Sequence, residues 1–209
     1  DKMRMLADPT SAYTINAVNA LNRKMDDVII EAFIATAYTG KTGSTTVAFG
    51  AGTAPGFVTS EVAVDYVESG AATDSNMTPA KLRRVRYLLD KSEAANEGEA
   101  DLYLAIDPSQ IQAMLQTPEL TSADYNTIKA LVQGEIDTWM GFKFIKTNKL
   151  PKDANNVRSC YAWEKHGMLL AMGSEIMVDV AKRPDKRNSV QVYVCGSFGA
   201  SRMWEEKVI

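Results

Sequence analysis

The chain has 209 residues, of which 45% are apolar and 23% are charged. This balance is typical of a folded protein and excludes collagen, coiled coils and intrinsically disordered chains. The 23 basic and 26 acidic residues give a formal net charge of −3. This charge excludes a dedicated nucleic-acid-binding protein, because such proteins normally have a pI above about 9.

The first expected element is a long helix from about Pro9 to Tyr38. Asp8 can cap its start, proline suits the first turn, and Gly40 lies where a left-handed cap would end it. A helix of about 28 residues would be about 42 Å long, so we expect a strut. Apolar residues recur along it at steps of three and four and share one face: Val18, Leu21, Met25, Val28, Ile29, Ala32 and Phe33.

The sequence then becomes rich in Gly, Ser, Thr and Ala. Lys41–Gly56 indicates a loop or weak hairpin, with a short strand at Thr45–Phe49. The apolar residues of Phe57–Tyr66 mostly alternate, which predicts a strand. Glu68–Asn76 is typical of a turn-rich break.

The middle of the chain is expected to alternate helices and strands. Thr78 followed by Pro79 is a helix start, and Asp107-Pro108 with Gln110 has the pattern of a capping box. The expected elements are a helix from Pro79 to about Asn96, a strand at Leu102–Ile106, a short helix after Asp107 that ends at Thr117-Pro118, a helical stretch at Tyr125–Val132 and a strand at Phe142–Thr147.

Strand patterns dominate the last third of the chain. Val157–Trp163, Met168–Met172 and Glu175–Val180 are strand candidates. Apolar and other residues alternate in Ile176–Val180 and again in Val190–Val194, which predicts a long β-hairpin. Its tip carries four basic residues: Lys182, Arg183, Lys186 and Arg187.

No motif predicts an enzyme. Gly40-Lys41-Thr42 resembles part of a phosphate-binding loop, but Ala35 stands where that loop needs a glycine, and the motif follows a helix instead of opening one. A single histidine, His166, cannot build a two-histidine metal site, and no Gly-x-Ser-x-Gly elbow supplies a nucleophilic serine. We therefore expect no catalytic residue, no cofactor and no metal.

The two cysteines, Cys160 and Cys195, lie in apolar, strand-like segments. Two cysteines in a chain of this length make no disulfide framework, so we expect two buried thiols; a disulfide between them is the alternative. No apolar run reaches the roughly 18 residues needed to cross a bilayer, and no basic-then-apolar signal segment opens the chain. We expect no membrane partner.

Two polar surfaces remain as candidate sites of contact between subunits. The basic hairpin tip could project and meet acidic groups on a neighbouring subunit. The polar loop Thr117–Asp124, which contains Glu119 and Asp124, could lie at the axis of a ring of subunits.

Three segments follow the long helix in a definite order. In Asp101–Pro108 a strand runs into an Asp-Pro helix start, in Gly141–Pro151 a strand leads to a Leu-Pro turn, and Val192–Arg202 is a closing strand that ends at an arginine. With the charged hairpin, this order resembles the major capsid proteins of tailed bacteriophages, which have the Hong Kong 97-type shell fold. Members of that family also carry an N-terminal arm and an extended loop before the helix, whereas this sequence begins close to the helix.

The resemblance implies an α+β fold with a peripheral domain, residues 1–57 and 174–209, and an axial domain, residues 58–173. It implies a structural subunit that self-assembles through pentamers and hexamers into the icosahedral capsid of a virion, in the cytoplasm of a bacterial host. The shell would enclose DNA without sequence-specific binding, and its partners would include portal, scaffold and decoration proteins. Thr117–Asp124 would lie near the capsomer centre and Lys182–Ser189 near a threefold junction.

Two alternatives stay open at this point. An encapsulin-like nanocompartment shell has the same fold and would be distinguished by a neighbouring gene for a cargo enzyme. A small cytosolic α+β enzyme would instead show one deep pocket lined by carboxylates with perturbed pKa values.

Overall fold

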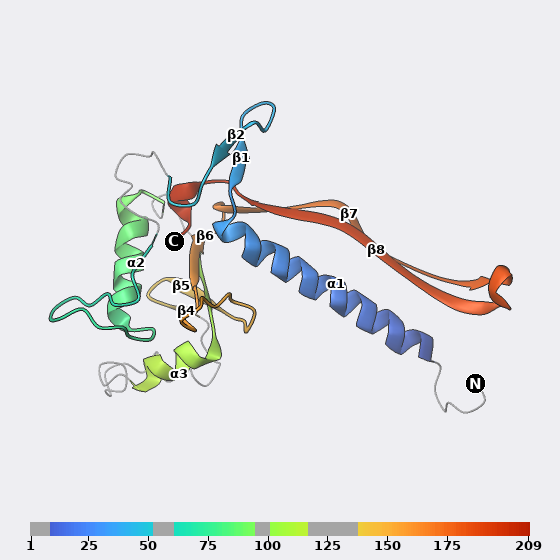
Figure 1. The fold of residues 1–209 in the computed structure, drawn as a ribbon, viewed down its shortest axis with the longest axis horizontal. Coiled ribbons are helices and arrows are strands. Elements are labelled where there is room, and N and C mark those ends of the chain that lie inside the picture. The colour runs from blue at the N-terminus through green and yellow to red at the C-terminus, as the bar shows by residue number, and fades with distance from the viewer. Residues whose placement is uncertain (1–8, 52–60, 95–100, 117–137) are drawn as a thin grey trace. The chain divides into compact units, whose positions relative to one another are not determined.

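A computed structural model describes residues 9–51, 61–94, 101–116 and 138–209. The chain divides into two compact units. Unit 1 comprises Asp1–Ala32 and Leu170–Ser201, and unit 2 comprises Phe33–Leu169 and Arg202–Ile209. Helices and strands occur together, as expected for an α+β protein (Figure 1).

Helix α1, Pro9–Ile34, is the long helix that the sequence predicts, although it ends four residues before Tyr38. The predicted apolar face is confirmed, because Val18, Leu21 and Met25 are half-buried whereas most of their neighbours are exposed. The helix ends early because the next residues enter strand β1, Ala37–Thr39, which pairs with β2, Thr45–Val47.

The C-terminal hairpin consists of β7, Met168–Arg183, and β8, Ser189–Arg202. The sequence pattern predicts two strands here, Met168–Met172 and Glu175–Val180, but the structure shows one continuous strand of 16 residues (Figure 1). A Cβ atom at Gly173 would lie 3.2 Å from the hydroxyl oxygen of Ser197. This glycine therefore permits a close approach of the two strands and does not break β7.

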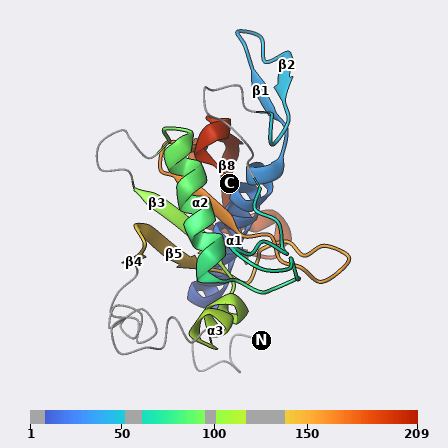
Figure 2. The same cartoon turned by 90° about the vertical axis from the view of Figure 1, so that its left-hand side faces the viewer.

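The sheet of unit 2 has the strand order β4-β5-β3-β6. Its strands are β3, Leu102–Ile106, β4, Thr138–Trp139, β5, Phe142–Lys146, and β6, Tyr161–Glu164. Strand β3 runs parallel to β5 and antiparallel to β6, and β4 is antiparallel to β5. Apolar residues from one face of the sheet and from α2, Pro79–Lys91, form the core (Figures 1 and 2). The largest of them are Leu82, Leu89, Leu102, Leu104 and Phe142.

Both predicted helix starts of unit 2 are confirmed. The hydroxyl oxygen of Thr78 accepts a hydrogen bond from the backbone N–H of Lys81 at the start of α2. At the start of α3, Pro108–Gln116, the side-chain oxygen of Gln110 accepts from the backbone N–H of Asp107 at 2.8 Å. This is the reciprocal bond of a capping box, and the Asp107 carboxylate accepts from the backbone N–H of Ser109 in return.

The predicted strand at Phe57–Tyr66 is wrong for its described part, residues 61–66. Here the Lys81 ammonium donates to the carbonyl oxygens of Val64, Ser75 and Asn76, which turns these carbonyl groups toward one cation. The predicted helix at Tyr125–Val132 lies outside the described residues.

A buried cluster holds the last turn of α1 against the C-terminal segment within unit 2. The Phe33 ring stacks on Tyr161 with 4.7 Å between ring centroids and packs against Trp163 at 4.8 Å. The guanidinium of Arg202, which is 4% exposed, donates to the carbonyl oxygens of Phe33 and Ala35 and forms an ion pair with Glu205. These bonds satisfy carbonyl groups that the end of a helix leaves without intrahelical partners.

Candidate assembly surface

The hairpin of β7 and β8 exposes more large apolar side chains than any other element of the described structure. In a strand, alternate residues point to opposite faces, and both faces of this hairpin carry such residues. On β7, Met172 is 56% exposed and Met177 is 62% exposed. The other exposed members are Leu169, Leu170, Val178, Val180, Val190 and Tyr193.

This exposure indicates a surface that another molecule covers. Monomeric proteins rarely leave large contiguous apolar patches in water, and an isolated two-stranded hairpin is only marginally stable. Met and aromatic residues are enriched in protein–protein interfaces, and both types are present here. The chemistry of this surface is therefore that of contact between proteins.

The basic tip forms as the sequence predicts. The turn is shorter than the stretch between the predicted strand runs Ile176–Val180 and Val190–Val194, because β7 extends to Arg183 and β8 begins at Ser189. A 3₁₀ turn at Pro184–Lys186 is followed by Arg187 and Asn188 in the left-handed region, with φ of 52° and 55°. Arg183 forms a bidentate ion pair with Asp185 within the turn.

The remaining cations of the tip, Lys182, Lys186 and Arg187, are exposed beside this internal pair. An ion pair between exposed groups contributes little to stability. The charges of the tip are therefore not needed to hold the subunit together, and they are accessible to other molecules. The other two predicted contact residues, Glu119 and Asp124, lie outside the described residues.

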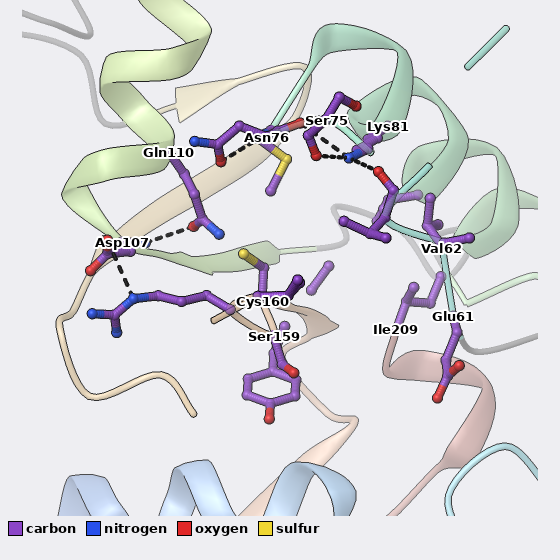
Figure 3. Close-up of a pocket in the computed structure, with 18 of the residues that line it drawn as sticks. Glu61, Val62, Ser75, Asn76, Lys81, Asp107, Gln110, Ser159, Cys160 and Ile209 are labelled. Carbon is purple, nitrogen blue, oxygen red and sulfur yellow. Dashed lines mark hydrogen bonds and ion pairs between the residues drawn. The ribbon is translucent and has the colours of Figure 1, made fainter. Parts of the chain in front are cut away.

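Unit 2 contains a pocket that residues of several segments line (Figure 3). It has a volume of about 970 Å³ and lies between α2, the start of α3, and the loops around Glu61 and Asn156. Burial raises the pKa of its Cys160 thiol to about 11 and lowers the pKa of Lys81. The thiol is protonated at neutral pH and is a poor nucleophile, and the lysine ammonium donates to three carbonyl oxygens.

Other chemical sites are not found in the described ranges. Both cysteines are free, and His166 lies in the turn between β6 and β7. Among these residues no group of three or more His, Cys, Asp or Glu side chains could hold a metal ion. No described helix is both long and apolar enough to cross a bilayer.

The comparisons with known proteins agree with a surface for contact between proteins. The family model described as phage capsid protein matches residues 1–209. No curated protein matches the sequence. Among solved structures, the chain is similar to one from Mycobacterium phage Che8, with 17% identity and a TM-score of 0.62 over 100% of this chain and 64% of that one.

Two cyanophage capsids show the same similarity. The chain of cyanophage P-SCSP1u gives 17% identity and a TM-score of 0.64 over 100% of this chain and 67% of that one. The chain of cyanophage Pam1 gives 14% identity and a TM-score of 0.62 over 96% and 66%. The chain thus spans about two thirds of the length of the capsid chains it matches, and the fold is that of a phage capsid protein, consistent with the Hong Kong 97-type. With a family model that matches its whole length, the chain belongs to the phage capsid protein family.

Proposed function

We propose that the protein is the repeating structural subunit of a tailed-phage capsid, and that its copies close into an icosahedral shell around the genome. The observation that carries the proposal is the exposed apolar hairpin in a member of the phage capsid family. Copies of one chain that contact each other through different surfaces form rings when the rotation closes. Five- and six-membered rings would build the shell.

The domain roles follow from the same proposal. Residues 1–57 and 174–209 would be the peripheral domain, and residues 58–173 would be the axial domain around the ring centre. Unit 1, with α1 and the hairpin, falls mostly in the first of these and unit 2 mostly in the second. In this arrangement Glu119 and Asp124 would face the ring axis and the hairpin tip would lie where capsomers meet.

The finer partners also belong to this proposal. The shell would assemble in the cytoplasm of the bacterial host and would bind portal, scaffold and decoration proteins. It would enclose DNA without reading its sequence, which the net charge of −3 supports, because affinity for DNA is dominated by cationic contacts to phosphates. Nothing in the comparisons favours a nanocompartment or an enzyme.

The proposal is tested by expressing the complete reading frame and examining it by negative-stain electron microscopy and light scattering. We expect closed particles tens of nanometres across. A stable monomer or dimer from the complete frame would contradict the shell function.

The tip is tested by Lys186→Glu with Arg187→Glu. The matched control reverses two exposed lysines of unit 2, Lys41→Glu with Lys91→Glu, and changes the net charge equally. We expect the tip variant to fold, as judged by circular dichroism, but to yield at least about tenfold fewer closed particles than the control, because like charges brought together at an interface cost several kcal/mol. An equal yield from both variants would refute the role of the tip.

A further inference from the structure

One surface loop of unit 2, residues 61–76, is acidic; we name it the acidic loop. No Lys or Arg occurs between Lys41 and Lys81 in the sequence. Most residues of the loop are exposed. It contains four carboxylates: Glu61, Asp65, Glu68 and Asp74. Glu68 forms an ion pair with Arg83 of α2 at 3.1 Å. The loop itself contains four acidic residues and no basic residue, so its own charge is negative.

A second loop of the same unit, residues 146–158, is basic; we name it the basic loop. It contains four basic residues and a single acidic residue, Asp153. The cations are Lys146, Lys149, Lys152 and Arg158. Lys146 and Lys152 are exposed.

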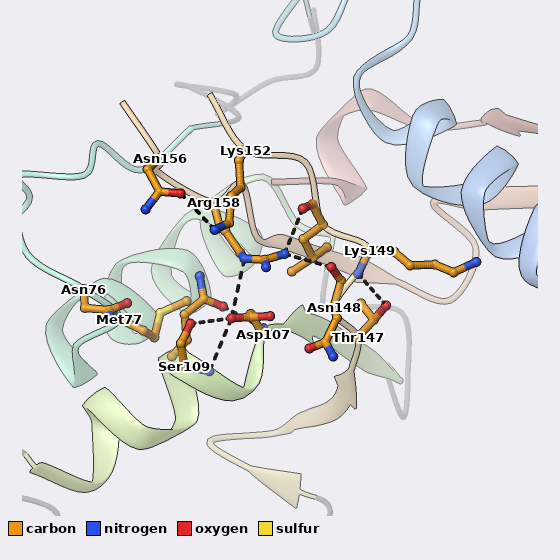
Figure 4. Close-up of polar contacts among 12 residues, drawn as sticks. Asn76, Met77, Asp107, Ser109, Thr147, Asn148, Lys149, Lys152, Asn156 and Arg158 are labelled. Atoms are coloured by element: carbon orange, nitrogen blue, oxygen red, sulfur yellow. Dashed lines mark hydrogen bonds and ion pairs between the residues drawn. The ribbon is translucent and has the colours of Figure 1, made fainter. Parts of the chain in front are cut away.

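The fold holds both loops in defined shapes. The Lys81 ammonium fixes the acidic loop through the carbonyl oxygens of Val64, Ser75 and Asn76. In the basic loop, the Arg158 guanidinium donates to the carbonyl oxygen of Asn148 at 2.9 Å (Figure 4). A partner of a fixed loop does not have to supply the free energy needed to order it.

Arg158 also connects the basic loop to the rest of unit 2. It donates to the carbonyl oxygen of Leu150 at 3.1 Å and lies 3.5 Å from the Asp107 carboxylate (Figure 4). Within the loop, the Lys152 ammonium donates to the side-chain oxygen of Asn156 at 2.8 Å. The basic loop is therefore anchored on the start of α3 while Lys146 and Lys152 remain exposed.

Both loops contribute residues to the lining of the pocket of unit 2. Glu61 and Asp74 line it from the acidic loop, and Lys152 and Arg158 line it from the basic loop. One subunit therefore presents an acidic and a basic surface that are separated by a pocket of about 970 Å³.

Each loop also exposes a valine, Val64 at 37% and Val157 at 36%. A surface that combines an exposed apolar side chain with a rim of charge has the composition of a protein contact. The charges of the two loops are opposite, so each complements the other and neither complements itself. A contact between them joins two different surfaces, which is the type of contact that builds rings.

We propose that the acidic loop of one copy docks against the basic loop of the next copy and that this contact sets the neighbours around a ring. The proposal rests on the proposed shell function and specifies one of its contacts. Charge complementarity selects the partner loop, because two acidic loops or two basic loops brought together would repel each other. Exposed charges also predict that the contact weakens at high ionic strength.

The test uses two charge reversals in the complete reading frame. The basic variant of the acidic loop is Glu61→Lys with Glu68→Lys, and the acidic variant of the basic loop is Lys146→Glu with Lys152→Glu. A quadruple variant combines all four changes and keeps the net charge of the original chain. The control is Lys41→Glu with Lys91→Glu, and circular dichroism confirms folding of each variant.

We expect each double variant to yield about tenfold fewer closed particles than the control, and the quadruple variant to restore most of the yield, because the contact then has its charges exchanged. Failure of the quadruple variant to exceed the double variants would overturn the contact while leaving the shell function in place. Double variants that assemble as well as the control would also overturn the contact. If the unchanged chain forms no particles, the proposed shell function fails, and the contact fails with it.

Discussion

Replacing Arg202 by Met removes the charge at the centre of the buried cluster that joins the last turn of α1 to the C-terminal segment. The side chain of Arg202 is 1% exposed and that of its partner Glu205 is 6% exposed. The guanidinium also donates to the carbonyl oxygens of Phe33 and Ala35 and lies 5.2 Å from the ring centroid of Phe49. The variant would leave a buried carboxylate without its cation.

Breaking a buried ion pair by removing one partner destabilises a protein by about 3–5 kcal/mol. Typical domains unfold with a free energy of only about 5–15 kcal/mol, so the loss would be a large fraction of the total. We expect Arg202→Met to lower the free energy of unfolding of the unassembled subunit by about 3–5 kcal/mol in urea titrations followed by far-ultraviolet circular dichroism.

Two variants separate this explanation from a general effect of losing an arginine. Arg183→Met removes an arginine that also pairs with a carboxylate, Asp185, but at the exposed hairpin tip. Its cost should be below about 1 kcal/mol. Arg202→Met with Glu205→Gln should recover more than about 1 kcal/mol, because the buried charge is gone. A cost below about 1 kcal/mol for Arg202→Met, or no recovery in the double variant, would refute the reasoning.

Three further predictions concern unit 2. The Ser109 hydroxyl and the nearby Arg158 guanidinium hold the pKa of Asp107 below its ordinary value of 3.8. Its stabilising contribution is therefore complete above about pH 5 and is lost as the pH falls through the lower folded value. Asp107→Asn should flatten the acid branch of a stability curve measured in urea, and an unchanged branch would contradict this. The pKa of Cys160 is near 11. In a Cys195→Ser variant, the Cys160 thiol should therefore react with iodoacetamide at pH 8 far more slowly in the folded protein than in urea. Equal rates in the two conditions would disprove the burial of the thiol. Gly141 has φ +82°, and a Cβ atom there would lie 2.8 Å from a guanidinium nitrogen of Arg86. Gly141→Ala should therefore lower the free energy of unfolding by about 1–2 kcal/mol. A loss near zero would show that the turn relaxes to accommodate the methyl group.

Short-range signals predicted the elements of this fold well. The apolar face of α1 and the strands of the hairpin follow directly from periodicity, and the two helix starts follow from capping residues at fixed spacing. At Asp107 the sequence even predicts which side chain bonds back, because Gln110 stands three residues later. Each of these features is decided by residues within one or two turns of each other.

The observed elements differ from the predicted ones where a residue that is distant in the sequence decides the local structure. Helix α1 ends near Ile34 where Arg202 binds its last carbonyl groups, and Arg202 lies about 170 positions later in the chain. The predicted strand before Tyr66 is a bent loop, in which Lys81 binds the carbonyl oxygens of Val64, Ser75 and Asn76. At Gly173 the observed strand is longer than the predicted one. Glycine commonly interrupts strands, but here it makes room for Ser197 of the paired strand β8.

The candidate assembly surface was only partly visible in the sequence. The basic residues of the tip stand out because four of them lie within the six residues Lys182–Arg187, but alternation alone predicts one buried and one exposed face for a hairpin. Only the structure shows that both faces of β7 expose apolar residues such as Met172 and Met177. The opposition of the acidic and basic loops was also invisible, because it depends on the folding of residues 61–76 and 146–158 around one pocket.

The exposed hairpin connects stability to assembly. A strand of 16 residues is about 54 Å long at about 3.4 Å per residue, and in a single subunit it leaves apolar side chains on both faces in water. Any neighbour that covers them stabilises the hairpin by mass action, because it binds the folded form and not the unfolded one. Each added copy would then stabilise the surface that it completes, so the subunit would reach its full stability only within the shell.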